Sequence, residues 1–308
     1  MRVDIGKLTD RTAVLALGIL AGFAVGLSFN DGGRQRVAGW FAPTGSAPDT
    51  PATVTPALPV DQSKPETSST IPAAVLARVR GSGRVRVGVF GDSFGNGVWG
   101  ALYRQLPAAE GYDVLQFSKE ATGFTRYNRL DLEQRAREQL AAQPVDVAVI
   151  CFGANDLQPL WKGIDVYPLL GPKWKEIVGP RIDAFVARAR STGAAVFWLG
   201  LPVVRDQQMD GQLQQMEAFY AEHLHRLGVP LLDTRAASVD ADGKYNAHLP
   251  NPKTGKMMLV REPDGLHMNG VGYDRVTAAL AERIRTYSAR VRQQAGAPAP
   301  APTATPAR

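Results

Sequence analysis

Residues 85–93 read VRVGVFGDS, a strand-like apolar run that ends in a Gly-Asp-Ser turn. A second run, residues 145–152 (VDVAVICF), is apolar almost throughout, which is typical of a strand buried on both faces of a sheet. Further strands are predicted at residues 112–117, 194–201 and 229–232. The chain therefore carries a regular series of short strands, and the first of them leads directly into a polar turn.

Helical patterns alternate with these strands, at residues 131–142, 173–191, 207–227 and 271–294. This βαβα order predicts an α/β fold of three layers, a parallel sheet with helices on both faces. In such sheets ligands bind beyond the carboxyl ends of the strands. Polar residues that follow a predicted strand are therefore the first candidates for a functional site.

The two margins of the 308-residue chain differ in composition from its centre. Residues 12–30 carry no charge and follow a basic N-terminus, which predicts an uncleaved signal-anchor helix with residues 1–11 in the cytoplasm. Residues 31–72 are a Pro-rich linker and residues 295–308 a disordered Ala/Pro tail. One domain, residues 73–294, is left. We expect a single-pass protein of the inner membrane whose catalytic domain is periplasmic or extracytoplasmic.

Charge and cysteine content exclude several classes of protein. The 35 Lys and Arg residues against 29 Asp and Glu give a net charge of +6, but they are scattered and form no basic stripe interleaved with aromatic residues. A nucleic-acid partner is therefore not predicted. The single cysteine, Cys151, excludes an intramolecular disulfide and a zinc site built from several thiolates.

Four polar side chains at predicted strand ends and before the last helix can form one catalytic group. A serine hydroxyl becomes nucleophilic when a base takes its proton, and the base works best when a carboxylate orients it. Asp264 and His267 are three residues apart and can come from one loop to meet Ser93, which follows the first strand. The N–H of Ser93 and the side-chain amide of Asn155 are candidate donors to an oxyanion.

These residues lie in three sequence blocks that, in this order, resemble the SGNH (GDSL-type) hydrolases. The blocks are GDS at 91–93, GAND at 153–156 and DGLH at 264–267, and the resemblance spans about residues 84–288. Each block is weak alone, but together they are specific. The resemblance implies the flavodoxin-like fold of that family and ester chemistry that needs neither a metal nor a cofactor.

The resemblance also implies a role for each matched residue. Ser93 is then the nucleophile, His267 the base and Asp264 the carboxylate that orients it. The oxyanion hole is formed by Ser93, Gly123 and Asn155. Gly123 is the best match to the family's second block, although the Asn that usually precedes this glycine is absent.

The first block departs from the family pattern as well, because Phe94 replaces the common Leu. The departures resemble a bacterial, membrane-anchored and uncharacterised branch of the family. Asp92 and Asp156 are predicted to order their turns by accepting hydrogen bonds from backbone N–H groups.

Other side chains are weaker candidates for substrate binding. Trp161 and Trp174 could line an acyl or sugar pocket, although ordinary packing explains them equally well. Arg126 could hold an anionic substrate, with a solvated arginine as the alternative. His223 and His225 are two residues apart on one predicted helix and face different directions, so no joint metal site is predicted.

Three functions remain open. The leading hypothesis is a serine esterase of the cell envelope that removes a short acyl group, such as acetyl, from a glycan or related substrate. The second is an O-acyltransferase that passes the group to a polysaccharide and receives it from a membrane acyltransferase partner. The third is a catalytically silent glycan-binding module. The joint presence of Ser93, Asn155, Asp264 and His267 argues against the third and does not separate the first two.

Overall fold

The computed structural model describes residues 70–297 of the chain. The predicted signal-anchor at residues 12–30, nearly all of the linker and residues 298–308 of the tail lie outside the described residues. Between residues 70 and 297, no helix is both long and apolar enough to span a membrane.

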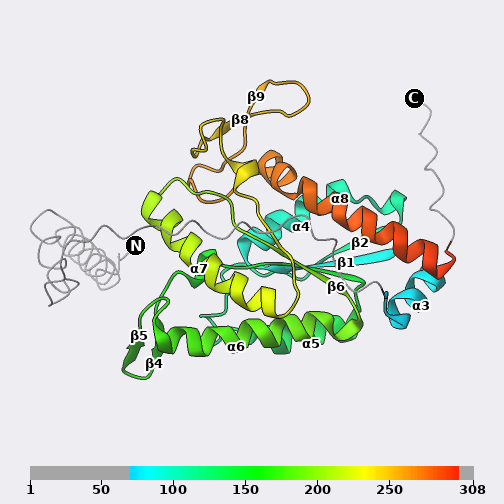
Figure 1. Cartoon of the computed structure of the whole chain (residues 1–308), viewed down its shortest axis with the longest axis horizontal. Coiled ribbons are helices and arrows are strands. Elements are labelled where there is room, and N and C mark those ends of the chain that lie inside the picture. The colour runs from blue at the N-terminus through cyan, green and yellow to red at the C-terminus, as the bar shows by residue number, and fades with distance from the viewer. Residues whose placement is uncertain (1–69, 298–308) are drawn as a thin grey trace, which may run out of the picture. The chain divides into compact units, whose positions relative to one another are not determined.

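A five-stranded sheet with the strand order β2-β1-β3-β6-β7 forms the centre (Figure 1). Every neighbouring pair is parallel, as the alternation of strands and helices predicted. The strands are β1 (Val85–Gly91), β2 (Tyr112–Gln116), β3 (Val147–Cys151), β6 (Ala195–Leu199) and β7 (Leu231–Leu232).

Helices cover both faces of the sheet, so the three-layer α/β architecture is confirmed. One layer contains α3 (Ala73–Ser82), α4 (Ser93–Gln105) and α8 (Gly270–Ala295). The other contains α5 (Leu132–Ala142), α6 (Pro172–Ala189) and α7 (Gln207–Arg226). Short 3-10 turns η1 to η4 lie at Ala108–Glu110, Ala154–Asp156, Arg190–Thr192 and Ala236–Ser238.

Two small antiparallel hairpins project from the three-layer core (Figure 1). They are β4 (Leu160–Lys162) with β5 (Asp165–Tyr167), and β8 (His248–Pro250) with β9 (Met257–Leu259). The first follows β3 and the second precedes α8. The sequence pattern predicted none of these four short strands.

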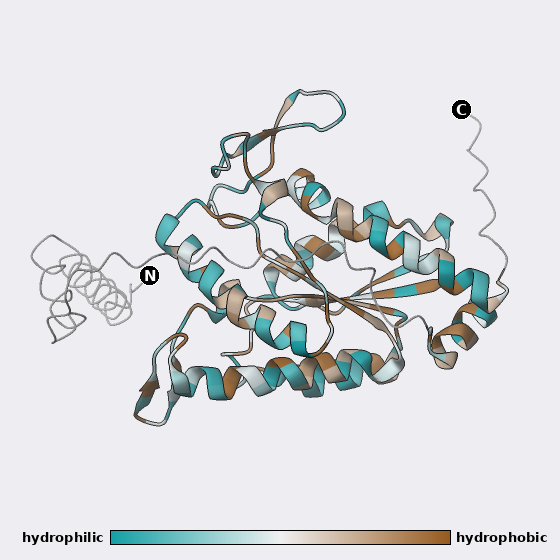
Figure 2. Ribbon diagram, viewed as in Figure 1, coloured by the Kyte–Doolittle hydropathy of each residue, from teal (hydrophilic) through white to brown (hydrophobic). Residues whose placement is uncertain are grey.

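Apolar burial explains the arrangement of the layers. All five residues of β3 are buried, as expected for a central strand with helices on both faces. Figure 2 shows hydrophobic residues concentrated in the central strands and hydrophilic residues along the outer sides of the helices.

Helix α3, which was not predicted, is attached to the sheet by one arginine. Arg78 Nε donates to Asp146 Oδ1 at 2.9 Å, and its Nη2 donates to the carbonyl oxygens of Val145 and Thr192 at 3.0 and 2.9 Å. The carboxylate of Asp146 is buried and also accepts from the N–H of Arg86 at 2.9 Å. A buried charge is tolerated when it is paired and hydrogen-bonded in this way.

The register of the sheet places the functional turns together. Gly91 at the end of β1 pairs with Cys151 at the end of β3, so the chain leaves both strands at the same edge. The loop after β2 joins them there, because Lys119 N–H donates to the carbonyl oxygen of Gly91 at 2.8 Å. The carboxyl edge of β1, β2 and β3 therefore gathers three loops at one place.

Candidate active site

Ser93 lies where β1 turns into α4. Gly91 is required there, because a Cβ atom at this position would overlap the carbonyl oxygen of Cys151. Asp92 caps the helix, and its Oδ1 accepts from Phe94 N–H at 2.9 Å, as predicted for this turn. Ser93 is thus the first residue of a 13-residue helix. The positive end of the helix dipole lies beside its hydroxyl, where negative charge is stabilised.

A continuous row of hydrogen bonds joins Ser93 to two other predicted site residues. Ser93 Oγ lies 2.8 Å from His267 Nε2, and His267 Nδ1 lies 2.6 Å from Asp264 Oδ2. The other oxygen of Asp264 accepts from the N–H groups of Leu266 and His267, both at 2.9 Å. The short loop therefore holds its own carboxylate and imidazole in a fixed relation, and the fold brings this loop to Ser93.

The charge of Asp264 decides which nitrogen of His267 carries the proton. Partial burial raises the pKa of Asp264, but hydrogen bonds from the ring and backbone of His267 and from Leu266 N–H outweigh this, so its pKa is below the ordinary value. An ionised carboxylate only accepts, so Nδ1 must carry the proton and donate it. Nε2 is then left with a lone pair that can accept from Ser93 Oγ.

The loop of Asp264 and His267 is held from outside by Arg205, which follows β6. Arg205 N–H donates to the carbonyl oxygen of Gly265 at 2.9 Å, and its Nη2 donates to that of Pro263 at 2.5 Å. Gly265 has a φ of +73°, and a Cβ atom there would overlap the Arg205 guanidinium. The glycine is needed both for the turn and for this close contact.

Asn155 lies in η2, directly after β3, and is oriented by Asp92. Asn155 Nδ2 donates to Asp92 Oδ2 at 3.2 Å, and Asp92 is fully buried. Burial raises the pKa of Asp92 to about 7, but both the neutral and the ionised carboxyl group offer an acceptor at this oxygen. This contact fixes which end of the Asn155 amide carries the donors, and it leaves the second N–H of Nδ2 available.

Gly123 lies against the same block, through Asp156. A Cβ atom at Gly123 would be 2.5 Å from Asp156 Oδ1, so only glycine fits this close approach. Asp156 Oδ1 accepts from the N–H and the hydroxyl of Thr125, each at 2.8 Å, and its Oδ2 accepts from Tyr220 OH at 3.0 Å. Asp156 thus accepts from a backbone N–H, as predicted, but that of the Thr125 loop and not of its own turn, and it fastens the Gly123 loop beside Asn155.

A family model matches residues 86–283, which contain all of these residues. The chain belongs to the DUF459 family. Its description is "Protein of unknown function (DUF459)". No curated protein matches the sequence.

Among solved structures, this DUF459 protein is similar to a native aryl esterase of M. smegmatis. The identity is 15%, with 66% of this chain and 99% of that chain covered and a TM-score of 0.46. It is also similar to a GDSL-like lipase from Bacteroides thetaiotaomicron, with 17% identity, 70% and 98% coverage and a TM-score of 0.45. These likenesses are distant.

The three weaker candidates in this DUF459 chain differ in their surroundings. Trp174 is fully buried in the core and its indole N–H donates to the carbonyl oxygen of Gln158 at 3.0 Å, so it does not line an open pocket. Trp161 lies on the β4–β5 hairpin and is 70% exposed. Arg126 Nη1 donates to the carbonyl oxygen of Ala121 at 3.1 Å, closing its own loop.

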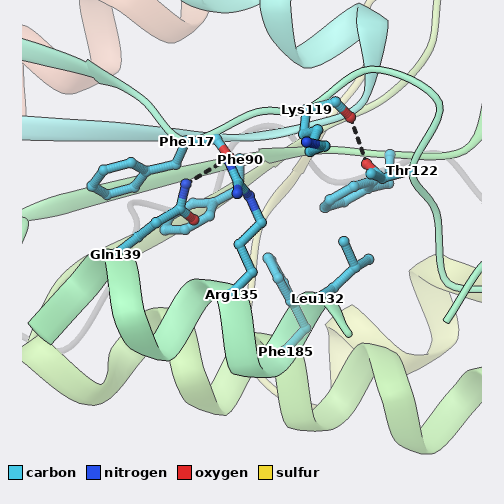
Figure 3. Close-up of a pocket in the computed structure, with 10 residues that line it drawn as sticks. Phe90, Phe117, Lys119, Thr122, Leu132, Arg135, Gln139 and Phe185 are labelled. Carbon is cyan, nitrogen blue, oxygen red and sulfur yellow. Dashed lines mark hydrogen bonds between the residues drawn. The ribbon is translucent and has the colours of Figure 1, made fainter. Parts of the chain in front are cut away.

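A small hollow, partly open to solvent and with room for about one water molecule, lies on the α5 side of the same edge (Figure 3). Figure 3 shows Arg135 and Gln139 reaching from α5 toward Phe90 and Phe117, and Leu132 on the side of Thr122. None of the residues that line it belongs to the row of Ser93, His267 and Asp264. Within residues 70–297, no cluster of three or more His, Cys, Asp or Glu side chains is placed to hold a metal ion.

Proposed function

We propose that the protein is a serine-dependent hydrolase of ester bonds. The observation that carries the proposal is the hydrogen-bonded row from Ser93 Oγ through His267 to Asp264, with distances of 2.8 and 2.6 Å. A serine, an imidazole and a carboxylate in this relation activate the hydroxyl for attack on a carbonyl carbon. The position at the carboxyl edge of a parallel sheet, where ligands bind in such folds, supports the same function.

In the proposed reaction His267 Nε2 accepts the proton of Ser93 as its oxygen attacks the ester carbonyl carbon. Asp264 holds Nδ1–H and stabilises the imidazolium that forms. The proton then passes from His267 to the leaving alcohol, which leaves an acyl group on Ser93. A water molecule, deprotonated by His267, attacks this acyl-enzyme and releases the acid and the free serine.

The negative oxygen of each tetrahedral intermediate needs hydrogen-bond donors already in place. We assign these to the N–H of Ser93, the N–H of Gly123 and the side-chain amide of Asn155. The N–H groups of the first helical turn have no acceptor within the helix, which leaves that of Ser93 available. The contact of Asn155 with Asp92, and of Gly123 with Asp156, supports donors that are fixed before substrate arrives.

We further propose that the substrate carries a short acyl group, such as O-acetyl, on a glycan of the cell envelope. Support comes from the sequence, where the uncharged residues 12–30 and the Pro-rich linker suit a membrane-anchored enzyme that reaches outward. Transfer of the acyl group to a polysaccharide, with a membrane acyltransferase as donor, remains the alternative outcome. The proposed mechanism uses no metal and no cofactor.

The test is to give the purified full-length protein an activated acetyl ester, with and without a polysaccharide acceptor, beside Ser93→Ala. We expect free acetate from the wild type and a loss of turnover on the order of 10³-fold or more in the variant. Equal turnover in the two proteins would refute the serine mechanism. Acetylated acceptor in place of acetate would identify a transferase.

A further inference from the structure

Phe94, the residue after the proposed nucleophile, lies against the proposed base. Its side chain is 1% exposed, and its ring stacks on that of His267 with centroids 4.9 Å apart and planes inclined by 27°. Phe94 therefore packs on a face of the His267 ring and makes no hydrogen bond to it. It also stands where the resembling hydrolases commonly have leucine.

A second aromatic residue supports Phe94 from α8. Tyr273 meets the Phe94 ring edge to face, with centroids 6.3 Å apart and an interplanar angle of 77°. Gly97 makes room for it, because a Cβ atom at this position would overlap the Tyr273 ring. His267, Phe94 and Tyr273 thus form a row of three rings. Gly97, one helical turn after Phe94, leaves the space that the Tyr273 ring occupies.

The hydrogen bonds of His267 leave one motion of its ring unrestrained. The N–H and the lone pair of a neutral imidazole lie in the plane of the ring, so the bonds to Asp264 at Nδ1 and to Ser93 at Nε2 act within that plane. They hold the ring against displacement along the row, but they oppose only weakly a tilt about the line that joins the two nitrogens. A flat ring stacked on one face opposes this tilt, whereas a branched aliphatic side chain offers no flat surface.

The stacking acts on charge as well as on position. When His267 takes the proton of Ser93 it becomes a cation, and the face of an aromatic ring attracts a cation that lies over it. Phe94 is almost completely buried, so this attraction is little weakened by water. The charge exists only after proton transfer, and an interaction of this kind raises kcat rather than binding substrate.

We propose that Phe94 is a positioning residue for His267, which holds the imidazole in plane with Ser93 and Asp264 and stabilises the imidazolium. The catalytic part of this proposal rests on the proposed ester hydrolysis. The chain also offers a matched control, Phe219, which packs against another histidine, His223. Their ring centroids are 4.9 Å apart, and the Phe219 ring meets the His223 ring edge-on, with an interplanar angle of 67°. Phe219 is far from the proposed machinery in sequence, on α7.

The experiment compares full-length wild type with Phe94→Leu and Phe219→Leu in two readouts. The first is steady-state hydrolysis of an activated acetyl ester. We expect Phe94→Leu to lower kcat about tenfold, equivalent to about 1.4 kcal/mol, with KM within about twofold, and Phe219→Leu to change neither. A wild-type kcat in Phe94→Leu, or equal losses in the two variants, would overturn the proposal.

The second readout is the proton NMR signal of the Nδ1–H of His267, assigned by its loss in His267→Gln. This proton is strongly hydrogen-bonded to Asp264, so it resonates far downfield while the ring is held in place. We expect the signal to broaden or vanish in Phe94→Leu and to persist in Phe219→Leu; a persistent sharp signal in Phe94→Leu contradicts the positioning role. If Phe94→Leu does not fold, Phe94→Met, which fills more of the volume without a ring, takes its place.

The two readouts also separate this inference from the proposed function. If the wild type hydrolyses no ester but its Nδ1–H signal is lost in Phe94→Leu, the positioning of His267 stands and the proposed function fails. If the wild type is active through Ser93 and the signal and kcat survive in Phe94→Leu, the function stands and the inference fails.

Discussion

Residues 70–297 contain two aspartate–histidine pairs with nearly equal hydrogen-bond distances, and of these two only the pair of Asp264 and His267 adjoins a serine. Asp264 and His267 are 2.6 Å apart at the carboxyl edge of the sheet, and Asp183 and His223 are 2.7 Å apart between α6 and α7. Each histidine also has a phenylalanine ring with its centroid at 4.9 Å. A carboxylate and an aromatic ring nearby are therefore not sufficient to distinguish the candidate site, although the Phe94 ring stacks on His267 at 27° and the Phe219 ring meets His223 edge-on at 67°.

The difference lies in what surrounds the rest of each ring. His267 Nε2 meets Ser93 Oγ, whereas the Cε1 and Nε2 side of His223 packs against Gly179, where a Cβ atom would not fit. Arg226 Nη2 lies 2.7 Å from His223 Nδ1, so a guanidinium also contacts this ring. An aspartate–histidine pair thus becomes a candidate catalyst through a nucleophile on the far nitrogen.

The largest difference in kcat is expected between variants of the two histidines. Replacing His267 with Gln removes the base, and kcat for an activated acetyl ester should fall on the order of 10³-fold or more, as for Ser93→Ala. His223→Gln removes an equivalent ring from the other pair and should leave kcat within about twofold. Similar losses in the two variants would show that the pairs do not differ as their surroundings indicate.

Replacing the two aspartates should give the same difference in kcat between the pairs, at a smaller scale. Asp264→Asn keeps the shape but no longer enforces a proton on Nδ1, so we expect kcat to fall about 10²- to 10⁴-fold. Asp183→Asn should leave kcat unchanged and reduce only stability. Parallel measurements of kcat and of the urea midpoint of unfolding distinguish the two effects, and a full activity in Asp264→Asn would contradict the proposed role.

Replacing Asp92 tests whether this carboxyl group orients the proposed oxyanion donor Asn155. This support has no counterpart in the comparison with Asp183 and His223. Asn at this position can donate as well as accept, so the Asn155 amide can turn its oxygen toward residue 92 and lose its fixed orientation. We expect Asp92→Asn to lower kcat roughly tenfold, less than the 10²- to 10³-fold expected of Asn155→Ala. In the double variant the losses should not add, because both changes act through one donor; fully additive losses would contradict the coupling.

The smallest effect on activity is expected from Glu217, a buried carboxyl group on α7. Burial raises the pKa of Glu217 from 4.5 to about 7, so the folded protein holds its proton more tightly than the unfolded chain does. Its contribution to stability is complete below pH 4.5 and is lost as the pH rises toward 7 and above. Between pH 5 and 8 the free energy of unfolding should therefore fall more steeply in the wild type than in Glu217→Gln, by on the order of 1–3 kcal/mol.

Urea unfolding of both proteins at pH 5 and pH 8 measures this difference. Activity assays on the same samples provide the control, because Glu217 makes its hydrogen bond to Leu201 N–H and touches none of the proposed site residues. An equal pH dependence of stability in the two proteins would contradict the raised pKa.

Sequence patterns predicted the sheet because its strands are short apolar runs that must be buried on both faces. They also selected Ser93 and Asn155, since residues that follow parallel strands converge at one edge. Asp264 and His267 were selected because they stand three residues apart before the last predicted helix. The hairpins β4–β5 and β8–β9 were missed, because strands of three residues have no measurable alternation.

Contacts between segments that are distant in the chain were also not predicted from the sequence. The stacking of Phe94 on His267 joins α4 to the loop before α8, and no local pattern records it. The same holds for Asp156, whose carboxylate binds the Thr125 loop and not its own turn. One signal was present in the sequence. Phe94 and Gly97 are not ordinary helix formers and lie within one helical turn of each other, which indicates a special contact on that face of the helix.

The central claim, that His267 activates Ser93, is tested most directly by an active-site-directed fluorophosphonate, which reacts with activated serines. Mass spectrometry of the labelled full-length protein should find one adduct, on the peptide that contains Ser93. The adduct should be absent from Ser93→Ala, form at least about tenfold more slowly in His267→Gln, and form at the wild-type rate in His223→Gln. An unlabelled Ser93, or labelling at the same rate in His267→Gln, would contradict the claim.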